Sequence, residues 1–149
     1  MREILFRGKQ ADNSEWIVGS LLQDDDGKTY IVGYEHRGGI DGMIDAELTS
    51  WAVIPETVGQ YTGLLDKNGT KIFEGDIVKG IAYSVTKIGV IVWIDEISSF
   101  GVRYAQNLTA WENSSILRCV SMGKTDEFAA EVIGNIYDNP ELIGGETNG

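Results

Sequence analysis

The single histidine and the single cysteine are the first residues that could do chemistry. His36 and Cys119 would form a nucleophile–base pair if the fold brought the imidazole and the thiol together. His36 lies in a glycine-rich stretch that predicts a loop, and Cys119 lies in an apolar run. We therefore interpret Cys119 as a core thiol and His36 as a surface imidazole. The same scarcity excludes an intramolecular disulfide and a zinc site built from cysteine and histidine.

Two short patterns resemble pieces of catalytic motifs but lack the rest of them. Residues 84–87 and 121–124 match Ser-x-x-Lys, which needs a helical turn to bring the lysine beside the serine, and both lie in strand-like surroundings. Residues 27–29 and 123–125 read Gly-Lys-Thr, like the end of a phosphate-binding loop. That loop also needs a glycine five residues earlier, and neither match has one. We therefore interpret these segments as ordinary strands and surface turns.

Several carboxylates are close neighbours in the sequence. Residues 24–27 read Asp-Asp-Asp-Gly, whereas a calcium loop needs alternating ligands and a later glutamate. The pairs at 74 and 76 and at 95 and 96 could each supply a general acid and a general base. Carboxylates that flank strands more often keep the strand ends soluble. The sequence therefore predicts no catalytic residue, no metal and no cofactor.

Aromatic residues are the more promising candidates, because exposed rings on a β-sheet form binding platforms. Trp16 and Trp93 lie in the most apolar runs, and we assign both to the core. Trp111 lies between polar stretches, which makes it the best candidate for an exposed anchor. The predicted interaction surface consists of Tyr30, Tyr34, Tyr61 and Trp111.

Composition limits the possible partners. The chain has 149 residues with 12 Lys and Arg against 23 Asp and Glu, a net charge of −11. Such a charge repels phosphate, so we expect neither general nucleic-acid binding nor attraction to an anionic membrane. The chain starts with charged residues and contains no long apolar run, which predicts a cytoplasmic location.

The apolar runs are short and are separated by many of the 19 glycines, a pattern typical of strands and turns. Asn68-Gly69 predicts a tight hairpin turn, and 88–94 predicts a central strand buried on both faces. Helical periodicity is nearly absent. The predicted fold class is mainly β, a small barrel or roll with very little helix. The predicted strands are 3–7, 16–22, 29–32, 50–54, 60–64, 71–73, 77–83, 88–94, 100–104, 116–120 and 131–137.

Three segments resemble a known family. They are Ile-Pro-Glu-Thr-Val-Gly-Gln-Tyr-Thr-Gly-Leu at 54–64, Asp-Lys-Asn-Gly-Thr-Lys-Ile-Phe-Glu-Gly-Asp-Ile-Val at 66–78 and Glu-Val-Ile-Gly-Asn-Ile-Tyr-Asp-Asn-Pro-Glu-Leu at 131–142. The opening at 4–8, followed by Trp16 and Gly19, is similar to the start of the same family. The chain thus resembles the YopX-like proteins of phages and prophages. The residues that carry the motif are Gly59, Gln60, Tyr61, Gly63, Asn68, Gly69, Gly75, Asp76, Gly134, Asn135 and Pro140.

The resemblance implies a phage or prophage protein with an SH3-like β-barrel portion and an oligomeric state. It implies no catalytic residues, and the motif itself is interpreted as structural. We expect one β-rich domain over 1–143 and a flexible tail over 144–149. An arrangement in two lobes, about 1–58 with the C-terminal strands and about 59–125, stays open.

The function predicted from the sequence is a self-associating, non-catalytic β module that binds a host or phage protein. One alternative is an acidic mimic of DNA that occupies a host nucleic-acid-binding protein, or a modulator of such a protein. A second alternative is a small-molecule-binding protein or an enzyme that uses carboxylates.

Overall fold

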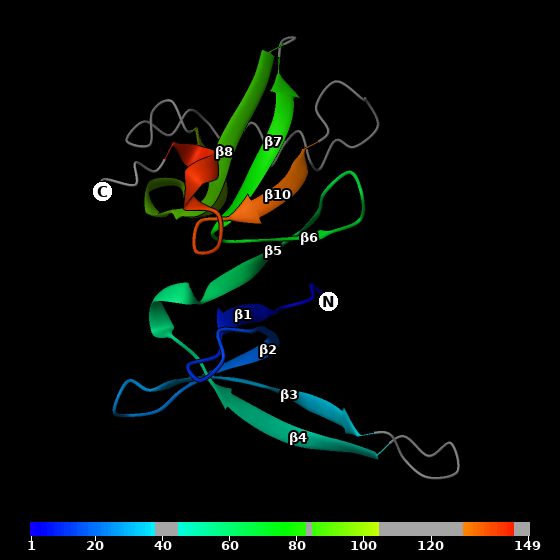
Figure 1. Cartoon of the computed structure of the whole chain (residues 1–149), viewed down its shortest axis with the longest axis vertical. Helices are drawn as coiled ribbons and strands as arrows, with labels where there is room; N and C mark the ends of the chain where they lie inside the picture. The colour runs from blue at the N-terminus through cyan, green and yellow to red at the C-terminus, as the bar shows by residue number, and fades with distance from the viewer. Residues whose placement is uncertain (38–44, 83–84, 105–129, 145–149) are drawn as a thin grey trace. The chain divides into compact units, whose positions relative to one another are not determined.

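The computed structural model describes residues 1–37, 45–82, 85–104 and 130–144, and these ranges are mainly β-strand (Figure 1). The predicted mainly β class is therefore confirmed. Short 3-10 turns lie at Pro55–Thr57, Asp95–Ile97 and Pro140–Ile143. The strands are β1 (Phe6–Lys9), β2 (Trp16–Gln23), β3 (Thr29–Arg37), β4 (Asp45–Ala52), β5 (Gly59–Leu65), β6 (Lys71–Phe73), β7 (Asp76–Ala82), β8 (Val85–Ile94), β9 (Ser99–Tyr104) and β10 (Glu131–Asn135).

The strands form two antiparallel sheets, and the chain divides into two compact units, Met1–Gln60 and Tyr61–Gly149. One sheet has the order β4-β3-β2-β1-β5-β6, and the other has the order β10-β7-β8-β9. Strand β5 pairs with β1 in the first unit and continues into its pairing with β6 in the second. Within the described ranges neither order returns to its first strand, so the expected barrel portion is not confirmed.

The first unit has a small interior. Ile31 and Val53 are its buried apolar side chains among the described residues. Gln10 forms an isolated antiparallel bridge with Val53, beyond the end of β4. The buried hydroxyl of Thr57 holds the following turn, because it accepts a hydrogen bond from Lys9 N at 2.9 Å and donates to Ile54 O at 2.6 Å.

The second unit has a larger core, in which strands β6 to β9 meet β10. Leu64 and Val132 pack against this core. Its buried cluster consists of Ile72, Val78, Ile91, Val102 and Ala130.

Strand β8 is largely the buried central strand that its sequence predicts, but the core assignment of Trp93 is wrong. Val90, Ile91 and Ile94 are buried, whereas 44% of Trp93 is exposed. Trp93 lies opposite Phe100 near the end of the β8–β9 ladder, and the two rings meet edge to face at 5.0 Å. An apolar run predicts a strand, but it does not show where along that strand the core ends.

The turn predicted at Asn68-Gly69 joins β5 to β6 and is held by the carboxylate of Asp66. Its Oδ1 accepts hydrogen bonds from the backbone N–H groups of Asn68 and Thr70, both at 2.8 Å. Its Oδ2 accepts a hydrogen bond from Val132 N at 3.0 Å, so one side chain connects the turn to β10. Burial alone would raise the pKa of Asp66, but these backbone hydrogen bonds and one from the Thr70 hydroxyl outweigh it. The pKa therefore lies below the ordinary value of 3.8.

We expect Asp66→Asn to lower the free energy of unfolding by about 1–3 kcal/mol, since an amide nitrogen cannot accept the hydrogen bonds that one carboxylate oxygen receives. Chemical denaturation at neutral pH measures this loss. The matched control is Asp25→Asn, because Asp25 is exposed. Equal stabilities of the two variants would contradict the role given to Asp66.

The same carboxylate predicts a dependence of stability on pH. Because the folded-state pKa is depressed, the contribution of Asp66 is fully present above the unfolded value of about 3.8 and declines as the pH falls through the folded pKa. The difference in unfolding free energy between wild type and Asp66→Asn should be constant near neutral pH and shrink in acid. A difference that grows on acidification would show that the sign is wrong.

Candidate interaction surface

The alternation of side chains along β2, β3 and β4 places apolar residues on the face of the first unit's sheet that points away from its core. Leu22 lies opposite Tyr30, and Tyr34 lies opposite Leu48, so the register puts these residues on one face. Val18 has the same alternation in β2. We call this the outer face, and its most exposed members are Val18 (48%), Leu22 (52%), Tyr34 (65%) and Leu48 (63%).

The other face of the same strands carries the interior of the unit. Ile31 is fully buried there and lies opposite Leu21 and Trp51. Tyr30 lies on the outer face but is only partly exposed. The hairpin of β3 and β4 also extends beyond β2, because β2 pairs with β3 only from Thr29 to Val32. Tyr34 and Leu48 belong to this projecting part, which explains their high exposure (Figure 1).

One end of the outer face is basic and aromatic. Arg7 lies opposite Val18, and Lys9 lies opposite Trp16. The Arg7 guanidinium carbon is 4.7 Å from the centre of the Trp16 ring, and Lys9 Nζ is 5.7 Å from it. Two cations thus share one indole by cation–π attraction. Trp16 is partly exposed on the outer face, so its assignment to the core is wrong. Both cationic side chains are partly buried at this end of an otherwise acidic chain.

The opposite end of β2 leads into the acidic turn at residues 24–28. Asp24 Oδ1 accepts hydrogen bonds from Asp26 N at 3.1 Å and Lys28 N at 2.8 Å, so the turn closes on its own first side chain. Asp24, Asp25 and Asp26 are all exposed. With Lys28, the turn has a formal charge of −3 + 1 = −2. It is therefore interpreted as a solvated hairpin turn, as the sequence indicates.

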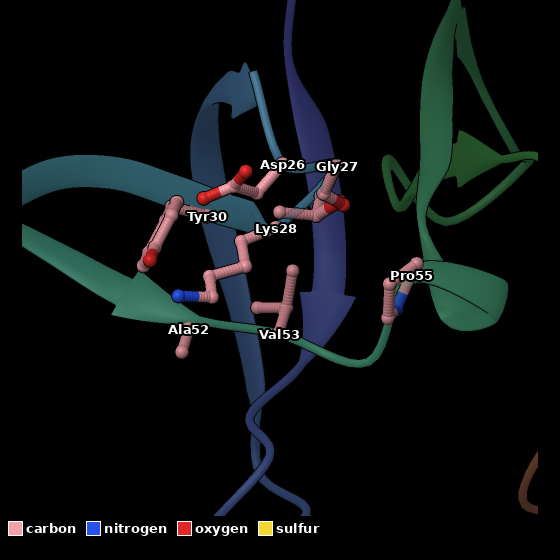
Figure 2. A pocket seen from close by; sticks show the side chains of 8 residues that line it. Asp26, Gly27, Lys28, Tyr30, Ala52, Val53 and Pro55 are labelled. Carbon is pink, nitrogen blue, oxygen red and sulfur yellow. The ribbon is translucent and has the colours of Figure 1, made fainter. Parts of the chain in front are cut away.

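A small open hollow of about 280 Å³ lies between this turn and the end of β4 (Figure 2). In Figure 2 the side chain of Lys28 runs beside Tyr30 toward Ala52. The hydroxyl of Thr29, which also lines the hollow, contacts Gly27 O at 3.4 Å and Gln23 Nε2 at 3.5 Å, so it is not an activated nucleophile. The residues that line the hollow are Asp26, Gly27, Lys28, Thr29, Tyr30, Ala52, Val53 and Pro55.

The residues predicted for an interaction surface divide into three groups. Tyr30 and Tyr34 share the outer face. Tyr61 is 7% exposed in the second unit, where it packs against Phe73 at 5.6 Å, so it does not contribute to a surface of exposed rings. The position of Trp111 lies outside the described residues.

The pairing of His36 with Cys119, considered first for chemistry, stays a prediction, because the described part of the chain does not include Cys119. His36 lies in β3, opposite Ala46, so the loop predicted to contain it begins later. Cys119 lies outside the described residues, and so does the whole Ser-x-x-Lys pattern at 121–124. The pattern at 84–87 lies outside them at its first residue.

The family motif residues lie at turns and strand ends. Gly59 and Gln60 pair with β1, and Gly63, Gly69 and Gly75 have positive φ angles. Buried Asp76 accepts a hydrogen bond from Phe73 N at 2.8 Å. The remaining positions surround the bulge and turn that follow β10: Gly134, Asn135 and Pro140.

Sequence reasoning missed Val18, Leu22 and Leu48, since it searched for exposed aromatic rings. The available signal was the run Trp-Ile-Val-Gly-Ser-Leu-Leu at 16–22. A half-buried antiparallel strand normally alternates apolar and polar residues, and this run does not. A strand that is apolar on both faces needs a cover on each of them.

The described residues contain no group of three or more His, Cys, Asp or Glu side chains placed to hold a metal ion. No helix in the same ranges is long and apolar enough to cross a membrane. The fold and the site thus define a small antiparallel β protein whose most distinctive feature is an exposed apolar sheet face.

The chain belongs to the YopX family, because the family model described as YopX protein matches residues 5–144. Among solved structures it is similar to the crystal structure of protein EF1440 from Enterococcus faecalis. The two chains are 26% identical, the TM-score is 0.59, and the match covers 96% of this chain and 99% of the other. No curated protein matches this chain.

The outer face depends on the close approach of β2 and β3 at Gly19, which predicts a sharp contrast between two glycines. A Cβ at Gly19 would overlap the backbone carbonyl oxygen of Val32, whereas one at Gly33 would meet Trp51 at 3.5 Å, an ordinary contact. We expect Gly19→Ala to lower the unfolding free energy by about 1–3 kcal/mol. Gly33→Ala, measured by the same denaturation experiment, should be milder. Equal effects would contradict the described packing of β2 on β3.

Proposed function

We propose that this protein is a non-catalytic β module that self-associates through the outer face of its first unit. A second copy of the chain covers Val18, Leu22, Tyr34 and Leu48. As the family resemblance implies, the module serves as a phage or prophage accessory protein. We further propose that it lies in the host cytoplasm and binds a host or phage protein. The observation that carries the proposal is the exposed apolar face itself.

The balance of burial in the first unit supports a partner on this face. Among the described residues of this 60-residue unit, Ile31 and Val53 are the buried apolar side chains. So small an interior gives the unit only marginal stability by itself, because small domains bury a low fraction of their surface. Contact between two outer faces would remove further apolar area from water.

The charges at the two ends of β2 indicate a second copy as the occupant. Arg7 and Lys9 lie at the Trp16 end, and the acidic turn with a formal charge of −2 follows the Leu22 end. A two-fold axis that sets one β2 antiparallel to the other would bring the basic end of each copy to the acidic end of its partner. A face with opposite charges at its ends is thus complementary to itself.

The expected strength of this association is modest. Burying the exposed half of a large apolar side chain stabilises by on the order of 1 kcal/mol, so four from each copy give on the order of 8 kcal/mol. Association costs about 4–15 kcal/mol in lost translational and rotational freedom. The two terms are comparable, so the equilibrium should depend visibly on protein concentration and on salt.

Sedimentation equilibrium over a range of concentrations tests the proposal. The wild type should be a reversible oligomer that dissociates on dilution and, because of the charged ends, more readily at high salt. Val18→Thr combined with Leu22→Thr should shift the protein to monomer while the strands stay intact, since threonine is a residue favoured in strands.

Leu65→Thr is the matched control, because Leu65 is 49% exposed in β5 but does not belong to the outer face. It should leave the mass in solution unchanged. A wild type that is monomeric at every concentration would contradict self-association. An oligomer that the double variant does not weaken would place the contact on another surface.

A further inference from the structure

The turn between β5 and β6 places an asparagine directly before a glycine at the protein surface. Asn68 and Gly69 are both exposed, and Gly69 has a φ of 81°. Asparagine is a thermolabile residue, because the backbone nitrogen of the next residue can attack its side-chain amide carbon. A glycine in that next position has no side chain to hinder the attack. The pair at 68–69 is therefore chemically disposed to lose the Asn68 amide as ammonia.

The folded turn holds both reacting groups in hydrogen bonds. The nucleophile is the backbone nitrogen of Gly69, and its N–H donates to Asp66 O at 3.0 Å. The electrophile is the side-chain amide of Asn68, whose Nδ2 donates to Glu131 Oε1 in β10 at 3.4 Å. The first bond holds the proton that must leave, and the second holds the amide toward Glu131. Both bonds therefore oppose the attack while the turn is closed.

The carboxylate of Asp66 keeps the turn closed. Its Oδ1 accepts hydrogen bonds from the backbone N–H groups of Asn68 and Thr70, and its Oδ2 accepts one from Val132 N. Opening the turn gives up these charge-assisted hydrogen bonds, which are the stronger kind. Local opening in a protein has a free energy of its own, separate from that of global unfolding. Asp66 therefore sets how often the turn opens.

We propose that Asn68 is a site of spontaneous deamidation, which the closed turn suppresses and each opening of the turn permits. The Gly69 nitrogen loses its proton to hydroxide and forms a bond to Asn68 Cγ. The bond from Cγ to Nδ2 breaks, and ammonia leaves with a proton from water. A second water opens the resulting cyclic imide at either carbonyl, which gives aspartate or isoaspartate at position 68. The sum of these steps replaces ammonia by water, with no oxidation or reduction.

Neither product fits the closed turn. Each carries a carboxylate where the Asn68 amide donates to Glu131, so like charges replace a hydrogen bond. Lys67 cannot offset this charge alone, because its Nζ already pairs with Glu131 Oε2 at 3.5 Å. Isoaspartate also adds an atom to the main chain, which moves the Thr70 N–H relative to Asp66. Conversion is therefore a one-way step that weakens the connection between the turn and β10.

The rate of conversion in the full chain tests the proposal. Chains are incubated at mildly alkaline pH, where hydroxide is more abundant, and proteolytic peptides are followed by mass spectrometry. Digestion separates Asn68 from the other Asn-Gly pair at 148–149. The reference is a capped peptide that spans residues 64–73 and has no folded turn. Asn68 in wild type should convert at least tenfold more slowly than in this peptide.

Variants of the turn test what controls the rate. Asp66→Ala should raise the rate at Asn68 at least fivefold, each chain being compared with the peptide of its own sequence. Ile91→Val is the matched control, because Ile91 is buried in β8 outside the turn and its truncation also lowers stability. It should leave the rate near that of wild type. Glu131→Ala, which removes only a partly exposed acceptor, should raise the rate at least twofold even if Asp66→Ala does not fold.

The stability of the converted protein tests the one-way step. Wild type that has converted at Asn68 should unfold at a lower denaturant concentration than fresh protein. Asn68→Gln should keep its stability over the same incubation, since its longer side chain would have to close a larger and less favourable ring. The site lies in the second unit, so Val18→Thr with Leu22→Thr should leave the rate unchanged.

Four results would overturn the proposal. They are a wild-type rate equal to that of the peptide, equal acceleration by Ile91→Val and by Asp66→Ala, no acceleration by Glu131→Ala, and converted protein that is as stable as fresh protein. A rate that changes in the outer-face double variant would contradict a site controlled by this turn.

Discussion

The register of β2, β3 and β4 is the constraint on which the rest of the first unit depends. Since side chains alternate along a strand, the pairing that buries Ile31 also turns Leu22, Tyr34 and Leu48 outward together. A shift of one residue in the register would exchange the two faces, so the register determines both the interior and the exposed surface. The close contact of Gly19 with the backbone of β3 helps to fix this register.

The second unit is organised differently, around a core and a carboxylate. Its buried apolar cluster is larger, and Asp66 connects the Asn68-Gly69 turn to Val132, which lies in β10. These hydrogen bonds cross from one end of the unit's sequence to the other. The second unit therefore contains its own stabilising contacts, whereas the first leaves much of its apolar surface exposed.

The sequence predicted the mainly β class, the hairpin turn at Asn68-Gly69 and the buried strand that contains Val90 and Ile91, because turn chemistry and β-branched runs are local signals. Tyr34, one of the rings predicted for an interaction surface, is exposed, and its role in binding stays a prediction. The burial of Tyr61 and the exposure of Trp93 were not, since both depend on where a strand ends relative to the core. The apolar run at 16–22 offered a local signal for Leu22, whereas the exposed face of Leu48 required the register between strands, which no local pattern contains.

The central claim is that a second copy covers the outer face, and hydroxyl-radical footprinting at low and high protein concentration tests it most directly. The modification of Val18, Leu22, Tyr34 and Leu48 should fall as concentration rises, while that of Leu65 and Ile97, which are comparably exposed in the second unit, stays constant. Unchanged modification of the outer face across a concentration range in which the mass increases would contradict the account.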